Sequence, residues 1–158
     1  MSFATHHQGP REQRTFGPLA ALGLAVLCVS VTSEAAVAAS KAETESYVVE
    51  ITASDGYKAG AEGKVKVTLV AKGTYHINGQ YPYKFKTAAP PPDGVSYPRP
   101  ILTRPDGTFE ATRAAFQIPF VAARAGKASV GGVFHLSVCT EANCIMDKVP
   151  LEIAVDVK

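Results

Sequence analysis

Alternation of apolar and polar residues dominates the chain after its first 46 residues and sharply limits what it can fold into. The alternating runs are residues 64–69, 83–86, 116–120 and 149–157, and residues 47–51 are expected to form a further strand. A period of two places one face of a strand in a core and the other face in water. No segment of this part has the periodicity of an amphipathic helix. We therefore expect an all-β domain of about seven to nine strands.

Turn signals separate these runs and point to the architecture. They are Asp55-Gly56, Asn78-Gly79, Asp106-Gly107 and Ala125-Gly126. Short strands with regular turns are typical of a two-sheet antiparallel sandwich. Two features interrupt the pattern. Six of the eleven prolines fall in residues 90–105, which predicts an irregular loop or a weak edge segment. The Gly131-Gly132 pair lies inside a strand run and predicts a β-bulge.

The first 39 residues have the pattern of a secretory signal peptide. Arg11 and Arg14 precede a short apolar stretch, residues 19–31, and small residues follow at 35–39. The apolar stretch is too short and too interrupted by Gly and Ser to cross a bilayer. We expect cleavage after Ala38 or Ala39 and a periplasmic or secreted protein whose mature form has no stable membrane span. A polar leader, residues 40–45, would then precede one domain, residues 46–158.

The cysteines divide between these two parts. Cys28 lies in the signal peptide and would be discarded with it. The alternatives are an uncleaved anchor or a lipid-modified Cys28, although Leu27 stands where lipidation sites have a small residue. The mature chain keeps Cys139 and Cys144, separated by four residues. An even number of cysteines in an oxidising compartment predicts a disulfide.

A disulfide between these two cysteines is a weak structural staple. It closes a ring of about six residues, for which chain entropy gives roughly 2 kcal/mol. Disulfides in immunoglobulin-type sandwiches instead join the two sheets. Strand parity directs Phe134, Leu136 and Val138 inward and Cys139 outward, where another protein can reach it. A reachable disulfide can exchange.

Two other interpretations of the pair stay open. The first is an inert local disulfide in a non-catalytic secreted module with a binding or structural role. The second is a metal or copper-handling accessory protein. Only His76 and His135 are available as further nitrogen ligands in the mature chain, whereas a zinc site needs four ligands.

Charge and motifs exclude several function classes. Sixteen Lys and Arg against fourteen Asp and Glu give a net charge of +2, with no basic cluster in the sequence, so we expect no nucleic-acid partner. No Gly-rich phosphate loop joins a strand to a helix, and no hydrolytic constellation is visible. We expect no cofactor.

The residues around the cysteines resemble a known family. The segment 138–155, VCTEANCIMDKVPLEIAV, is similar to the end of the N-terminal domain of the thiol:disulfide interchange protein DsbD. The segment 73–85, GTYHINGQYPYKF, resembles that family's aromatic-histidine strand and the cap loop after it. The resemblance extends over residues 47–157, and the cysteine hairpin is its most specific part.

The resemblance implies a periplasmic, immunoglobulin-like domain that relays electrons. Such a domain receives electrons from a thioredoxin-like module and passes them to disulfide-containing periplasmic proteins. By position, Cys144 matches the cysteine that forms mixed disulfides with partners, and Cys139 matches the resolving thiol. Tyr81 or Tyr83 would be the cap aromatic that shields the pair, and His76 would lie beside it as a packing or partner-contact residue.

The chain also departs from the family. The family's cysteine spacing is often one residue longer, and its acidic cap residues are replaced by Asn78, Gly79 and Gln80. The membrane carrier and the C-x-x-C module are expected on other chains. No helix N-terminus is predicted near the pair, and His135 lies four residues from Cys139, about 13 Å along a strand. We therefore expect no strongly lowered thiol pKa and a relay that reacts mainly when docked.

Overall fold

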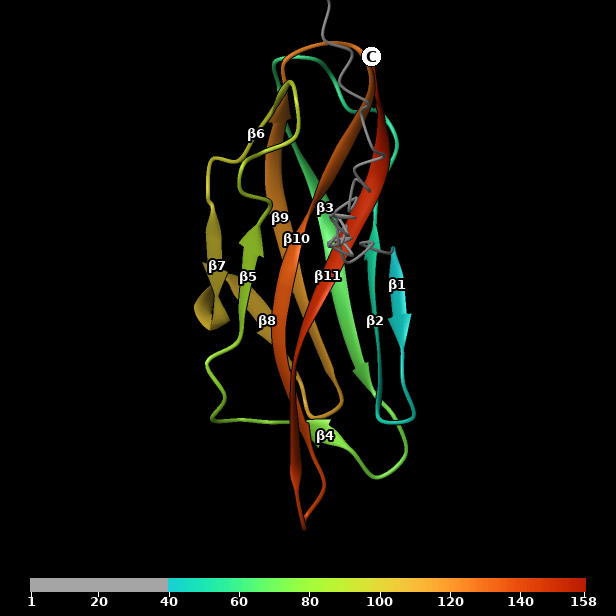
Figure 1. Ribbon diagram of the computed structural model, residues 1–158, viewed down its shortest axis with the longest axis vertical. Coiled ribbons are helices and arrows are strands. Elements are labelled where there is room, and N and C mark those ends of the chain that lie inside the picture. The colour runs from blue at the N-terminus through green and yellow to red at the C-terminus, as the bar shows by residue number, and fades with distance from the viewer. Residues whose placement is uncertain (1–39) are drawn as a thin grey trace, which may run out of the picture. The chain divides into compact units, whose positions relative to one another are not determined.

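The computed structural model of the protein describes residues 40–158, and the predicted signal peptide lies outside them (Figure 1). This part forms eleven strands and one short 3₁₀ helix: β1 (Lys41–Glu43), β2 (Tyr47–Thr52), β3 (Glu62–Ala71), β4 (His76–Ile77), β5 (Lys84–Thr87), β6 (Val95–Ser96), β7 (Ile101–Thr103), η1 (Arg104–Asp106), β8 (Gly107–Phe109), β9 (Arg113–Ala122), β10 (Gly126–Cys139) and β11 (Cys144–Val157). Among these residues no helix is long and apolar enough to cross a membrane.

The strands form two antiparallel sheets, so the predicted all-β sandwich is confirmed. One sheet has the order β1-β2-β3-β9-β6, with β8 also paired to β9. The other has the order β11-β10-β5-β7, with β4 also paired to β10. The five strands of two or three residues, β1, β4, β6, β7 and β8, bring the total above the expected seven to nine.

The core lies between the inward faces of the two sheets. In β9 the side chains of Phe116, Ile118 and Phe120 are at most 1% exposed, as the alternation predicted. Phe134 of β10 faces them from the other sheet. Its ring meets that of Phe116 edge to face, with centroids 5.5 Å apart. Burial of these apolar faces is the main force that holds the sheets together.

Residues 41–43, expected in a polar leader, are instead the edge strand β1. They pair with β2 in the register Lys41↔Glu50 to Glu43↔Val48. Lys72 donates to the Glu43 carboxylate at 3.0 Å and to the carbonyl of Thr44 at 2.9 Å. Polar composition misled the prediction because an edge strand needs few buried side chains.

Two local predictions have different outcomes. The proline-rich segment was expected to be an irregular loop or a weak edge segment. It contains two short edge strands, β6 and β7, which agrees with the second alternative. The bulge at Gly131-Gly132 is wrong, because the β10–β11 register continues without interruption through Gly131↔Glu152 and Gly132↔Leu151. The glycines are needed for close strand approach. A Cβ on Gly132 would lie 2.1 Å from the carbonyl oxygen of Lys86.

The β10–β11 hairpin positions the cysteines. Each strand has 14 residues, and the register runs from Gly126↔Val157 to Cys139↔Cys144. Strand β10 is central in its sheet, whereas β11 is an edge strand. In Figure 1 the turn of this hairpin reaches below every other labelled strand. The cysteine pair therefore closes the far end of the longest hairpin.

Candidate functional site

Cys139 and Cys144 form the predicted disulfide across the last pair of the hairpin. They are direct cross-strand partners, with Cα atoms 4.0 Å apart. Beyond them, the Thr140 N–H donates to the carbonyl of Asn143 at 2.8 Å and closes the turn. In an antiparallel ladder such close approach is typical of a non-hydrogen-bonded pair.

The two cysteines of the disulfide differ in exposure to solvent. Cys139 is 6% exposed, whereas Cys144 is an exposed residue. The expectation that Cys139 would be reachable is therefore wrong. Strand β4 pairs with β10 at Val138 and Cys139, so another strand lies against this end of β10. Parity along one strand carries no information about this neighbour. A partner that approaches the disulfide reaches Cys144.

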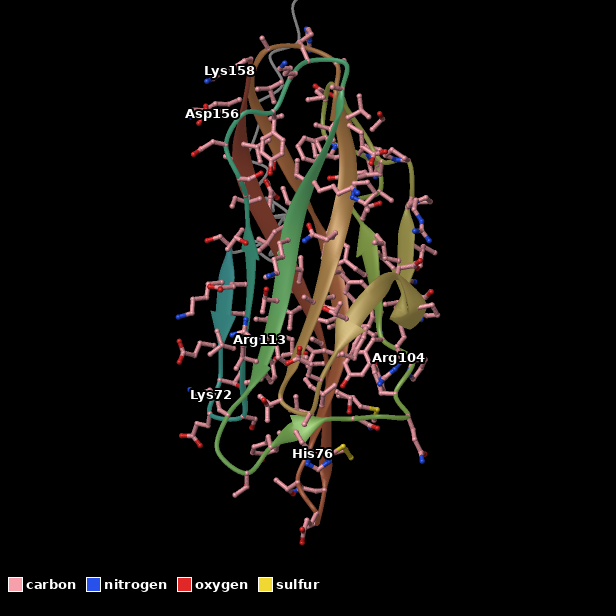
Figure 2. The ribbon with its side chains drawn as sticks, turned by 180° about the vertical axis from the view of Figure 1, so that it is seen from behind. Lys72, His76, Arg104, Arg113, Asp156 and Lys158 are labelled. Atoms are coloured by element: carbon pink, nitrogen blue, oxygen red, sulfur yellow. A yellow bond between two sulfur atoms is a disulfide. The ribbon has the colours of Figure 1, made fainter. Side chains whose placement is uncertain are left out.

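His76 lies in the same cross-strand row as the disulfide. It is the direct partner of Cys139 on β4, opposite the side on which Cys144 pairs. Figure 2 shows labelled His76 beside the yellow disulfide at the hairpin end of the sandwich. Its side chain is exposed. The structure thus brings together the three predicted residues His76, Cys139 and Cys144.

Asn78 is the side chain that reaches the exposed sulfur. Its Nδ2 lies 3.9 Å from Sγ of Cys144 and donates to Oγ of Ser137 at 3.3 Å. In the sequence, Asn78 signals only a turn with Gly79. Its place near the disulfide comes from the pairing of β4 with β10, which connects residues 59 positions apart.

Tyr83 anchors the loop that carries Asn78. Its ring is 1% exposed and packs against Phe109 at a centroid distance of 4.9 Å. Its hydroxyl donates to the Ser137 carbonyl and accepts from the Asn78 N–H, the latter at 2.9 Å. Burial is the main reason that the pKa of Tyr83 is raised to about 12. Tyr83 is thus a core residue that holds the loop.

Tyr81, the other predicted cap residue, is half-buried. It meets the Tyr83 ring edge to face at 5.1 Å. With Met146, Asp147 and Lys148 it lines a hollow of about 300 Å³ on the strand that leaves the disulfide. Met146 is 70% exposed and, with Ile101, is one of two exposed large apolar side chains among the described residues. This hollow offers an apolar contact two residues from Cys144.

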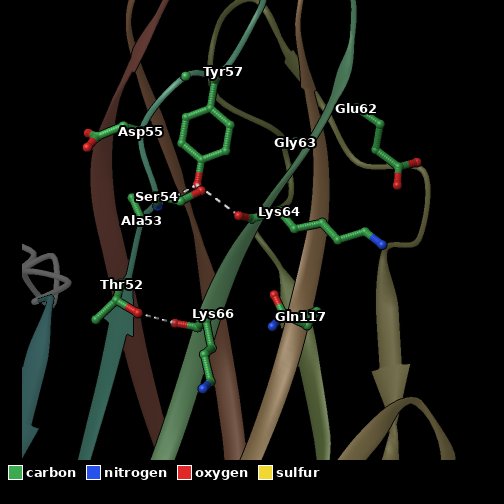
Figure 3. Close-up of a pocket in the computed structure, with 11 residues that line it drawn as sticks. Thr52, Ala53, Ser54, Asp55, Tyr57, Glu62, Gly63, Lys64, Lys66 and Gln117 are labelled. Atoms are coloured by element: carbon green, nitrogen blue, oxygen red, sulfur yellow. Dashed lines mark hydrogen bonds between the residues drawn. The ribbon is translucent and has the colours of Figure 1, made fainter.

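A larger hollow lies at the other end of the sandwich. It has a volume of about 600 Å³ and is lined by residues 52–57 and by β3 side chains (Figure 3). The Tyr57 hydroxyl crosses it and donates to the carbonyl of Lys64 at 2.8 Å. Tyr57 pairs with Val157, so this hollow lies 13 residues along β11 from Cys144. The hydroxyls of Thr52 and Tyr57 join this end of the sandwich to the backbone of β3.

The described residues contain no group of three or more His, Cys, Asp or Glu side chains placed to hold a metal ion. The disulfide is the reactive group that the site presents. Exchange requires one sulfur open to an attacking thiolate and a second thiol close enough to resolve the mixed disulfide. Cys144 and Cys139 meet both geometric requirements.

Fold and site together define a class: a two-sheet antiparallel β-sandwich with an asymmetrically exposed disulfide at a hairpin end. Comparisons with protein-family models, curated proteins and solved structures found no match for the chain.

Proposed function

We propose that the protein is a periplasmic or secreted thiol–disulfide exchange domain. In the oxidised state a donor thiolate attacks Sγ of Cys144, and Cys139 leaves as a thiolate. The donor's second thiolate then attacks the donor sulfur of this mixed disulfide, which releases Cys144 as a thiolate and leaves the donor with a disulfide. In the reduced state Cys144 attacks a partner disulfide. Cys139 then attacks the mixed disulfide, which restores the Cys139–Cys144 bond and leaves the partner with two thiols. Each cycle transfers two electrons.

The unequal exposure of the two cysteines is the observation that carries this proposal. Only Cys144 is open to solvent, so partners meet a single sulfur. Cys139 is held opposite it and is ready to resolve the mixed disulfide. A disulfide kept only for stability gains nothing from an exposed sulfur at the end of a hairpin.

The topology adds support for an immunoglobulin-like assignment. The orders β2-β3-β9-β8 and β11-β10-β5-β7 correspond to the A-B-E-D and G-F-C arrangement of such sandwiches, with β7 as an added strand. This assignment agrees with the resemblance to the N-terminal domain of DsbD. The partners proposed on that basis are a thioredoxin-like electron donor and disulfide-containing proteins of the same compartment.

The reduction potential of the pair tests the proposal. Mature protein is equilibrated with glutathione buffers, and its two redox forms are separated after alkylation. A value of roughly −120 to −270 mV is the range of exchange proteins and is the expected result. A value below about −300 mV marks a structural disulfide, and the protein would then be a non-catalytic binding or structural module.

Trapping with cysteine variants tests the assigned roles. Cys139→Ala leaves Cys144 without its resolving thiol, so it is expected to accumulate mixed disulfides with a small thioredoxin-like protein. Cys144→Ala is the matched control. It keeps only the buried thiol and is expected to trap little. Equal trapping by both variants would contradict the assignment of Cys144 as the exchanging sulfur.

A further inference from the structure

Cations gather on the same outer face of the sheet as the disulfide. His135 of β10 is directly opposite Lys148 on one side and Lys84 on the other. Lys86 lies two residues from Lys84 and shares its face. We call Lys84, Lys86 and Lys148 the lysine cluster. It draws its members from both strands that flank β10, which is why no basic run is visible in the sequence.

The lysine cluster has no direct ion-pair partner among the described residues. None of its lysines takes part in an ion pair within residues 40–158. Neighbouring carboxylates bind elsewhere: Asp147 accepts from the Tyr47 hydroxyl at 2.5 Å, and Glu152 accepts from Ser129. Burial and these three lysines lower the pKa of His135. Three lysines on the two strands that flank β10 give this face a positive charge, which is complementary to an anionic partner.

Lys148 of the cluster and the sulfur of Cys144 lie along one line on β11. Cys144, Met146 and Lys148 occupy alternate positions and therefore share a face. Lys148 lies four positions from Cys144 along the extended strand, a distance of about 13 Å. Met146 and the hollow beside Tyr81 lie between them. A segment bound along this face reaches the lysines and the sulfur at the same time.

We propose that the lysine cluster docks an acidic segment of a partner protein and aligns that partner's cysteine or disulfide with Cys144. This inference rests on the proposed exchange function and adds the chemistry of the partner. Charge complementarity of this kind raises association rates by about tenfold or more and is screened by salt. The partner is thus a protein whose redox cysteine is followed, about 13 Å away, by carboxylates.

Peptide mixed disulfides test the docking surface directly. Extended peptides carry one cysteine, bonded to thionitrobenzoate, and Glu, Gln or Lys residues about four positions from it. In reduced protein the Cys144 thiolate attacks the peptide sulfur, and thionitrobenzoate leaves as a coloured thiolate. Cys139 then attacks Cys144, closes the disulfide and releases the peptide thiol. The rate of colour release reports the first step.

The Glu peptide is expected to react roughly tenfold faster than the Lys peptide at low ionic strength, with the Gln peptide between them. The ratio is expected to fall toward one in about 1 M salt, where the Debye length is about 3 Å. The variant Lys86→Glu/Lys148→Glu changes two exposed residues and is expected to reverse the preference. Lys64→Glu/Lys66→Glu makes the same charge change on exposed residues of β3 and is expected to preserve it.

The outcomes separate this inference from the exchange function. Equal rates for all peptides, or loss of the preference in both variants, would overturn the docking surface and leave exchange intact. No colour release from any peptide would overturn the exchange function. In that case, anisotropy of a labelled, cysteine-free Glu peptide with oxidised protein still tests the surface, since binding must weaken in Lys86→Glu/Lys148→Glu. Lysine-dependent sedimentation with vesicles of phosphatidylglycerol and phosphatidylcholine, without peptide binding, would assign the surface to membranes.

Discussion

Asn78 shows how single side chains set access to the disulfide. Its amide is held by Ser137, and its loop is tied to β10 by the Tyr83 hydroxyl. The amide Nδ2 lies 3.9 Å from Sγ of Cys144, the more exposed of the two cysteines. The contact is weak because a thiol or disulfide sulfur is a poor hydrogen-bond acceptor. We expect this contact to shield Cys144 slightly from small reductants.

The variant Asn78→Ala is expected to speed reduction of the oxidised protein by a small dithiol. Removal of this contact exposes Cys144 further, and an effect of roughly 0.5 kcal/mol on the barrier corresponds to about a twofold to threefold change in rate. The measurement is the second-order rate constant for reduction by dithiothreitol. Gln80→Ala is the control, since it removes an exposed side chain from the same loop with no sulfur contact. An unchanged rate in Asn78→Ala would show that the amide does not shield the sulfur.

At the scale of single residues, the sequence predicts the cysteine pair but not the side chains and strands that surround it. The pairing of Cys139 with Cys144 follows from their number and spacing. The burial of Cys139 and the anchoring role of Tyr83 depend on a short strand that pairs far along the chain. The Tyr83–Ser137 hydrogen bond spans 54 positions. Local periodicity carries no signal for such a contact.

At the scale of elements, the β10–β11 hairpin is continuous because two glycines let its neighbours come close. A Cβ on Gly131 would lie 2.3 Å from the Leu151 carbonyl oxygen, and one on Gly132 would lie 2.1 Å from that of Lys86. Both obstacles are backbone atoms of adjacent strands, which cannot turn away as a side chain can. The glycines thus keep β10 paired on both sides between the core and the disulfide.

Gly132→Ala is expected to lower the free energy of unfolding by about 1–3 kcal/mol, the usual cost of overpacking. The added methyl group must push β5 away from β10. Urea denaturation followed by circular dichroism measures the change. Gly79→Ala is the matched control, because its Cβ would meet no atom within 4 Å. A Gly132→Ala variant as stable as Gly79→Ala would refute the close-approach explanation.

Long elements are the part of the fold that the sequence predicts well. Strands β3, β9, β10 and β11 have at least 10 residues each, so their alternation is visible despite single exceptions. Strands β4 and β6 have two residues each, too few to show a period. One of them, β4, carries His76 to the site. One of the least predictable elements therefore contributes to the candidate site.

At the scale of the folded unit, the disulfide and the sandwich are nearly independent. The two sheets are joined by their shared apolar core, whereas the disulfide links neighbouring strands of one sheet. Those strands already pair over 14 residues each. Opening the disulfide frees only the end of a hairpin and leaves every contact between the sheets in place. An exchange domain needs this property, since it must stay folded in both redox states.

Reduction of the disulfide is therefore expected to leave the protein folded and to lower its free energy of unfolding by about 2 kcal/mol or less. The chain-entropy term for a ring of about six residues sets that limit, and a domain of this size has roughly 5–15 kcal/mol of stability. Urea curves for oxidised and reduced protein measure the difference, and Cys139→Ser/Cys144→Ser provides a control that cannot reoxidise. If reduction unfolds the protein, the disulfide is a structural element of the sandwich and cannot open and close in a catalytic cycle. If both forms unfold cooperatively with this small difference, the sandwich serves as a rigid support on which a hairpin end changes redox state.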